Sequence, residues 1–143
     1  MPVVAHASKD VMDVCEELFT DSRWNCSTIR LAPNYLPDLT GGSREQAFVY
    51  ALASSAITQA VSKACSVGVT PKCGCGRLPN EPPPGEFKWG GCGDDVRFGT
   101  IFGETFTDMT TASRKKRDSR RELMNRHNSA VGRKVSEMTW KTR

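Results

Sequence analysis

Apolar residues recur at helical spacing at the start of the chain and then give way to a long loop. Val11, Val14 and Leu18 fall at this spacing among Asp, Glu and Lys, which predicts an amphipathic helix from about Ala5 to Thr20. Residues 21–42 are rich in Pro, Asn, Asp and Gly and hold few periodic apolar residues. Because these residue types form turns, we expect a long connection there.

The next predicted helix carries almost no charge. Ser43 and Gln46 have the spacing of a capping box directly before an apolar run, so we expect a helix to begin there. The run from Ala47 to Ala64 has no charged residue before Lys63. Its alanines are spaced so that another helix could approach closely: Ala47, Ala56, Ala60 and Ala64. A helix that is apolar on nearly every face is usually interior, so we place this one at the centre of the core.

Two further helices are predicted in the second half of the chain. Asp94 or Asp95 is suited to cap a helix that extends to about Asp108. A last helix is expected from about Arg120 to Trp140. Its side chains that fall near one stripe are Leu123, Met124, His127, Val131, Val135 and Met138. We find no internal repeat and no strand pair with hairpin chemistry, so the expected class is mainly α, with cysteine-pinned loops.

Composition narrows the class of protein. With 143 residues, 38% hydrophobic and 25% charged, the chain is expected to form one globular domain. No apolar run approaches the ~18 residues of a membrane-spanning helix. The first fourteen residues lack the basic start and apolar stretch of a secretory signal, so this N-terminus gives no argument for export.

The net charge of +4 comes from one cluster, because residues 114–121 carry +5 and the rest of the chain −1. A solvated loop is the commonest fate of such a run. The sharper hypothesis is contact with a sulfated polysaccharide or another polyanion. Aromatic residues do not interleave with the cluster, which argues against nucleic acid. The candidate contact residues are Arg114, Lys115, Lys116, Arg117, Arg120 and Arg121.

Six cysteines allow many pairings, and spacing alone does not choose among them. Pairing within loops is one hypothesis, in which each disulfide would contribute ~2–4 kcal/mol. The pairs would be Cys15 with Cys26, Cys65 with Cys73, and Cys75 with Cys92. A zinc site is the competing hypothesis, with four thiols from Cys65, Cys73, Cys75 and Cys92. It is disfavoured because structural zinc ligands usually come in pairs two to four residues apart.

The remaining candidates for chemistry are few. Asn25-Cys26-Ser27 matches the N-glycosylation sequon, which has meaning only in a secreted protein. His6 and His127 lie on predicted helices without a nucleophile motif nearby, and we interpret both as surface or packing residues. The sequence contains no nucleotide-binding or hydrolase motif, so no enzymatic activity is expected.

Several short blocks of residues follow one another along nearly the whole chain. They are Arg23-Trp24-Asn25-Cys26-Ser27, Arg44-Glu45-x-Ala47-Phe48-x-Tyr50-Ala51, Ala64-Cys65-Ser66, Cys73-x-Cys75, Trp89-Gly90-Gly91-Cys92-x-Asp94 and His127-Asn128-x-x-x-Gly132-Arg133. In their order and spacing these blocks resemble the Wnt family of secreted signalling glycoproteins. Within that family, Leu31–Leu36 and Phe48–Leu52 are most similar to the subfamily numbered eleven.

The resemblance implies an N-terminal helical bundle with long disulfide-stapled loops and the three local cysteine pairs. It also implies a developmental ligand, not an enzyme, that is secreted into the extracellular space and matrix. Its partners would be Frizzled receptors, co-receptors of the low-density-lipoprotein-receptor-related class and heparan sulfate proteoglycans, but not nucleic acid.

On this resemblance, residues 1–143 are expected to be part of the N-terminal domain, without the signal peptide, the acyl-serine segment or the C-terminal cysteine-rich domain. No cofactor is expected, and the family's covalent acyl chain would attach beyond residue 143. Membrane association would depend on that missing lipid. The alternatives are an isolated fragment that does not signal, or a reduced module that binds metal or nucleic acid.

Overall fold

Four α-helices and two short 3-10 helices lie within the part of the chain that the structure describes. This computed structural model describes residues 2–77, 85–86, 91–112 and 119–141. Within these ranges there is no β-strand, so the mainly α class is confirmed. The elements are α1 (Pro2–Leu18), η1 (Ser27–Leu31), η2 (Pro37–Leu39), α2 (Arg44–Val67), α3 (Val96–Ala112) and α4 (Ser119–Lys141).

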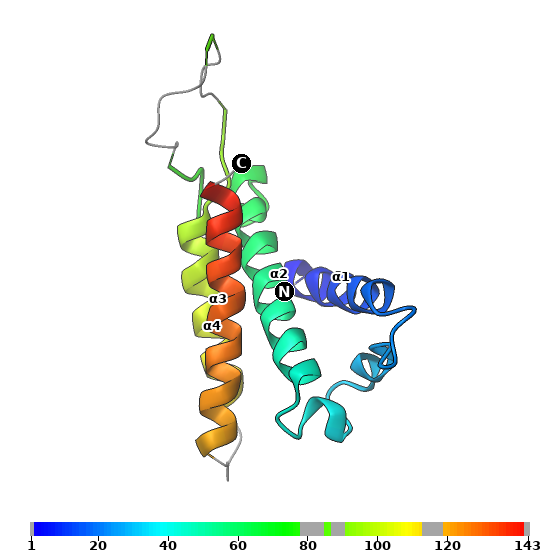
Figure 1. Ribbon diagram of the computed structural model, residues 1–143. Coiled ribbons are helices and arrows are strands. Elements are labelled where there is room, and N and C mark those ends of the chain that lie inside the picture. The colour runs from blue at the N-terminus through cyan, green and yellow to red at the C-terminus, as the bar shows by residue number, and fades with distance from the viewer. Residues whose placement is uncertain (1, 78–84, 87–90, 113–118, 142–143) are drawn as a thin grey trace.

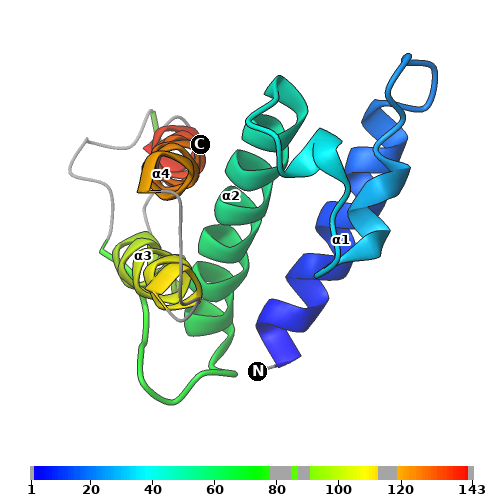
Figure 2. The same ribbon diagram turned by 90° about the horizontal axis from the view of Figure 1, so that it is seen from below.

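Helix α2 is the centre of the fold, as its apolar sequence predicts. It contacts α1, α3 and α4, and α3 also contacts α4. Figure 1 shows α3 and α4 side by side along α2, while α1 lies on the opposite side of α2. The view from below in Figure 2 places α2 between α1 and the α3–α4 pair.

Local capping sets both ends of α2. Ser43 Oγ accepts a hydrogen bond from the Gln46 N–H at 3.1 Å, as the capping box predicts. The Gln46 side chain returns to the N–H of Gly42, one residue before the cap, at 2.7 Å. At the other end Gly68 adopts a left-handed φ of +83° and its N–H reaches the Ala64 and Cys65 carbonyls. Glycine adopts this conformation at little cost, which stops the helix.

The first helix and the following loop form one small core. Helix α1 begins at Pro2, earlier than predicted, because proline is well tolerated at the first helical position. The sequence predicts a long connection with few periodic apolar residues, but two apolar residues of this loop are buried: Ile29 in η1 and Leu39 in η2 are only 2% and 1% exposed. They pack with Val11 of α1, Val49 of α2 and the Cys15–Cys26 disulfide. Isolated apolar residues fill this core without helical periodicity, so the pattern did not reveal them.

Helix α3 begins at Val96, where Asp95 Oδ1 accepts a hydrogen bond from the Phe98 N–H at 3.1 Å. Asp95 is therefore the cap. The other candidate, Asp94, accepts a hydrogen bond from Ser66 Oγ at 2.7 Å and ties the start of α3 to the end of α2. The helix continues to Ala112, one turn past the predicted end.

An apolar stripe on a helix usually faces the core, but most of the stripe predicted on α4 is exposed. Leu123 and Met138 are 66% and 57% exposed, and Val131 and Val135 are also exposed. The buried side consists of small or polar residues: Asn125, Ser129, Gly132 and Ser136. Hydrogen bonds satisfy this side, since Gln46 Nε2 donates to Asn125 Oδ1 at 3.0 Å and Ser55 Oγ pairs with Ser136 Oγ at 2.8 Å.

Small residues allow the helices to approach at backbone distance. A Cβ on Gly132 of α4 would lie 2.0 Å from the carbonyl oxygen of Ala51 in α2. A Cβ on Gly99 of α3 would lie 2.1 Å from Ser62 Oγ. Close packing of this kind gains dispersion contacts along the whole helix, which favours a small-residue face over a bulkier apolar one.

Candidate functional site

Three disulfides hold the loops to the helices. Their Cα–Cα distances of 5.9, 5.3 and 4.9 Å fall in the usual range for this bond. Cys15–Cys26 joins α1 to the residue before η1, Cys65–Cys73 joins the last turn of α2 to the next loop, and Cys75–Cys92 closes a longer segment. These are the pairs that the resemblance implies. All six cysteines are paired in this structure.

The described residues contain no group of three or more His, Cys, Asp or Glu side chains arranged to hold a metal ion. None of the helices among them is long and apolar enough to cross a membrane. His6 on α1 and His127 on α4 are both exposed, as surface residues would be.

The sequon lies in a surface turn in which Asn25 and Ser27 are exposed and the residue between them is buried. Asn25 is exposed, and its side-chain Oδ1 accepts a hydrogen bond from the Ser27 N–H at 3.2 Å. Cys26 between them is fully buried and has a left-handed φ of +62°. Non-glycine residues seldom adopt this conformation, and here the disulfide to Cys15 accompanies it. The Asn25 side chain is therefore accessible while the residue beside it is fixed in the core.

An ion-pair cluster joins η1 to α1, the two elements next to the Cys15–Cys26 disulfide. Arg30 of η1 donates hydrogen bonds to Asp13 and to both Glu16 carboxylate oxygens of α1, each at 2.7 Å. The hydrogen bond from Arg30 lowers the pKa of Glu16. All three side chains are substantially exposed, so the cluster orients η1 on α1 more than it stabilises the fold.

Asp38 links the sequon loop to η2. Its Oδ2 accepts hydrogen bonds from Trp24 Nε1 at 2.9 Å and from Thr28 Oγ1. Its backbone carbonyl accepts a hydrogen bond from Ser43, the cap of α2. Burial opposes ionisation, but the hydrogen bonds from Thr28 and Trp24 outweigh it and hold the pKa of Asp38 below its ordinary value of 3.8.

We expect Asp38→Asn to lower the free energy of unfolding by about 1–2 kcal/mol at neutral pH, because hydrogen bonds to a charged acceptor are lost. The carboxyl has a lower pKa folded than unfolded, so its contribution is present above the unfolded value of 3.8 and is lost as pH falls through the folded pKa. Urea unfolding at neutral and at acidic pH should therefore show the gap between variant and native chain narrowing in acid. An equal gap at both values would contradict this, and Asp21→Asn on the same loop is the exposed control.

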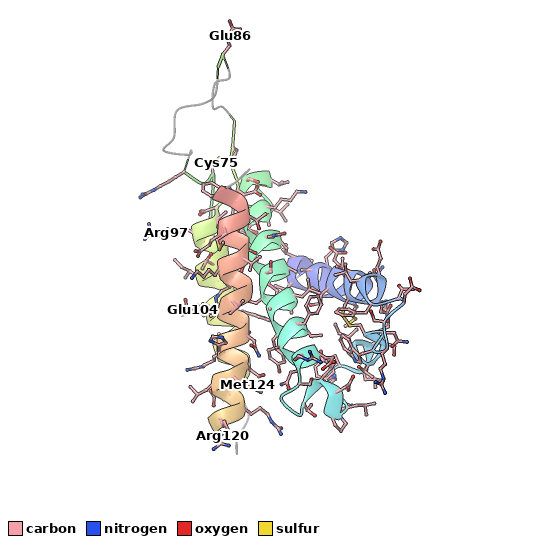
Figure 3. The ribbon with its side chains drawn as sticks, viewed as in Figure 1. Cys75, Glu86, Arg97, Glu104, Arg120 and Met124 are labelled. Carbon is pink, nitrogen blue, oxygen red and sulfur yellow. A yellow bond between two sulfur atoms is a disulfide. The ribbon has the colours of Figure 1, made fainter. Side chains whose placement is uncertain are left out.

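The basic cluster lies partly outside the described residues. Arg114, Lys115, Lys116 and Arg117 belong to the segment whose structure is not described. Arg120 and Arg121 are exposed in the first turn of α4. Figure 3 shows Arg120 and Met124 at the opposite end of the bundle from Cys75 and Glu86. The described part of the cluster is thus separate from the Cys75–Cys92 loop.

A groove between α1 and α2 is a surface that the sequence did not indicate. Its volume is about 960 Å³. Ala56, Ala60 and Ala64 of the predicted alanine row line its α2 side. Side chains of α1 from Pro2 to Val14, including Val3 and His6, line the other side. The apolar residues before Ala5 were the available signal, since they extend the helical stripe to the start of the chain.

Known proteins of one family match this arrangement. The wnt family profile matches residues 1–143. Protein Wnt-11 of Gallus gallus is 45% identical over 135 residues, which cover 94% of this chain and 38% of that protein. Protein Wnt-11b-2 of Xenopus tropicalis is 45% identical over 136 residues, with the same shares.

A solved structure has the same fold. A chain in the structure of human WLS in complex with WNT8A superposes with a TM-score of 0.69 at 31% sequence identity. The likeness covers 96% of this chain and 45% of that chain. The chain spans about two-fifths of the length of the curated relatives that it matches, since their coverage is 38%.

Proposed function

The chain belongs to the Wnt family, and from that premise we propose that it forms the helical part of a secreted ligand that binds Frizzled receptors and does no catalysis. The observation that carries the proposal is the match over the whole chain, with 45% identity to Wnt-11 of Gallus gallus. Three disulfides support a secreted location, because disulfides persist in oxidising compartments.

The proposed setting is the extracellular space and matrix during development. Co-receptors of the low-density-lipoprotein-receptor-related class and heparan sulfate proteoglycans are the further partners, and Asn25 is the glycan acceptor. In this proposal the covalent acyl chain belongs to a segment beyond residue 143. The described residues then act as a rigid scaffold, in which the disulfides fix the loops that the helices do not order.

A chimera tests this function directly. The segment of Gallus gallus Wnt-11 that matches this chain is replaced by residues 1–143, and the chimera is expressed in secreting cells. We expect the chimera to reach the medium and to bind a Frizzled extracellular domain with an affinity close to that of the parent, measured by interferometry. The structural reason is that the family profile matches residues 1–143 and that the fold likeness to the WNT8A complex covers 96% of this chain.

The matched control is the same chimera carrying Gly132→Val, which obstructs the approach of α4 to Ala51. This control should be retained in the cell. A native chimera that is retained like the control, or that is secreted without binding any Frizzled domain, would overturn the proposal.

The basic cluster gives a separate prediction. Replacing Arg114, Lys115, Lys116 and Arg117 with Gln should weaken retention on heparin and flatten its dependence on salt, because clustered cations bind polyanions through screened charge attraction. Elution from heparin over a salt gradient is the measurement. A variant with four dispersed replacements, Lys63→Gln, Lys72→Gln, Arg77→Gln and Lys134→Gln, has the same net charge and is the control. If the two variants elute at the same salt concentration, the result favours the alternative interpretation, in which the cluster is a solvated loop.

A further inference from the structure

We propose that closure of the Cys15–Cys26 disulfide and glycosylation of Asn25 are competing reactions, so that the disulfide decides whether the glycan is added. The inference rests on the secreted location proposed above. It concerns the sequon Asn25-Cys26-Ser27, whose middle residue is one of the two cysteines that form this disulfide.

The two reactions are distinct in chemistry. In glycosylation, Asn25 Nδ2 attacks the first sugar carbon of a lipid-pyrophosphate-linked oligosaccharide. A carbon–nitrogen bond forms, the carbon–oxygen bond to pyrophosphate breaks, the lipid pyrophosphate leaves, and Nδ2 gives up one proton. In bridge formation, the Cys15 and Cys26 thiols lose two electrons and two protons to the disulfide of a thiol oxidoreductase, which becomes a dithiol.

In the folded state, the sequon is a poor substrate for the glycosylating enzyme, although the Asn25 side chain is exposed. An enzyme that modifies a sequon has to reach both Asn25 and the Ser27 hydroxyl on a segment lifted away from the fold. Cys26 lies between them with 0% exposure, held by a covalent bond to α1. Its left-handed φ of +62° and the hydrogen bond from the Ser27 N–H to Asn25 Oδ1 also fix the local backbone in a turn.

The neighbouring residues anchor the same segment on both sides. The Trp24 ring packs edge-on against Phe19 with centroids 5.0 Å apart, and its Nε1 is bonded to Asp38. On the other side Ile29 is 2% exposed in the core. Without the bridge these contacts are non-covalent and can open locally. With it, the centre of the sequon cannot leave the core unless the sulfur–sulfur bond breaks.

The order of the residues along the chain makes the two reactions possible at nearly the same stage of synthesis. Cys15 precedes the sequon, so it is already present when Asn25 appears during synthesis. Its partner lies only 11 residues further along the chain. Closing a loop of about 10 residues takes on the order of 10–100 ns, whereas disulfide formation takes seconds or longer. Oxidation of the thiols, rather than their encounter, therefore sets the time that is open for glycosylation.

The test measures sequon occupancy in cells. The full chain is expressed behind a cleavable secretory leader, so that a failure of natural export or of receptor binding leaves this result unaffected. Occupancy is read as the glycosidase-sensitive band shift, and Asn25→Gln identifies that band. Cys15→Ser removes the bridge and leaves the sequon sequence intact. We expect its ratio of glycosylated to unglycosylated chain to rise several-fold over the native chain, and Cys26→Ser to behave alike.

The control variant is Cys65→Ser, which removes a bridge of similar span at the far end of α2. Its occupancy should stay at the native level. A brief labelling pulse followed by thiol alkylation should also show that newly glycosylated native chains still carry reduced Cys15 and Cys26. Equal occupancy in the native chain and Cys15→Ser would overturn the proposal, as would an equal rise in Cys65→Ser or an absence of glycan from every variant.

Discussion

Replacing Gly132 with Ala should lower the free energy of unfolding by about 3 kcal/mol, although alanine is the better helix former by about 1 kcal/mol. The added Cβ would lie 2.0 Å from the Ala51 carbonyl oxygen and 2.9 Å from the Ala51 Cα. Both atoms belong to the backbone of α2, so no side chain can rotate out of the way. Helix α4 has to move outward, which also lengthens the Gln46–Asn125 and Ser55–Ser136 hydrogen bonds.

Chemical denaturation followed by circular dichroism measures this effect. Gly103→Ala in α3 is the matched control, because it makes the same chemical change at a looser contact. Its Cβ would meet only the Thr58 hydroxyl at 3.0 Å and the flexible Arg133 side chain at 3.7 Å. We expect this control to change stability by no more than about 1 kcal/mol, since helix propensity offsets the crowding. A loss of stability no greater for Gly132→Ala than for the control would show that α4 is not packed at backbone distance.

Replacing Cys75 with Ser should remove about 3 kcal/mol of stability, reduce export and leave Cys92 with a reactive thiol. The two cysteines are 17 residues apart. A disulfide that closes a loop of this length lowers the chain entropy of the unfolded state, which stabilises the folded state by about 3 kcal/mol. Besides the disulfide, a hydrogen bond connects the two ends of the loop: the Gly76 N–H donates to the Gly93 carbonyl oxygen at 2.9 Å. Unfolding by denaturant, yield in the medium and alkylation of free thiols are the three readouts.

The double variant Cys75→Ser, Cys92→Ser separates stability from thiol chemistry. It lacks the same bridge but exposes no unpaired cysteine. We expect it to lose the same stability as the single variant and to be exported better. Normal export of Cys75→Ser with no new reactive thiol would refute the Cys75–Cys92 pair.

Much of the local structure could be predicted from short stretches of sequence. The Ser43–Gln46 cap of α2 and the choice of Asp94 or Asp95 as the cap of α3 depend on residues within a few positions of each other. Such signals need no knowledge of the rest of the chain. Family likeness extended this to the cysteine pairs, which spacing alone left open among several possibilities. The sequon, too, could be found by motif, but the burial of its middle residue could not.

The packing of α4 shows where this kind of prediction ends. Periodicity assumes that the core prefers the most apolar stripe of a helix, yet the stripe with Val131 and Val135 is exposed and the one with Ser129 and Gly132 is buried. The choice depends on a matching surface on α2, where the Ala51 backbone is open to close approach and Ser55 can pair with Ser136. That information lies about 80 residues away, since the Ser55 and Ser136 positions differ by 81.

By itself, therefore, the sequence determined the approximate places of the four α-helices among the described residues, the cap of α2, the central place of α2 and the family, because propensity, capping and motif spacing are encoded within short segments. Only the tertiary structure decided which side of α4 is buried, that Ile29 and Leu39 complete a core with α1, and that a groove remains between α1 and α2. These features arise when surfaces distant in sequence fit together, and their free energy depends on the distance and shape of both partners.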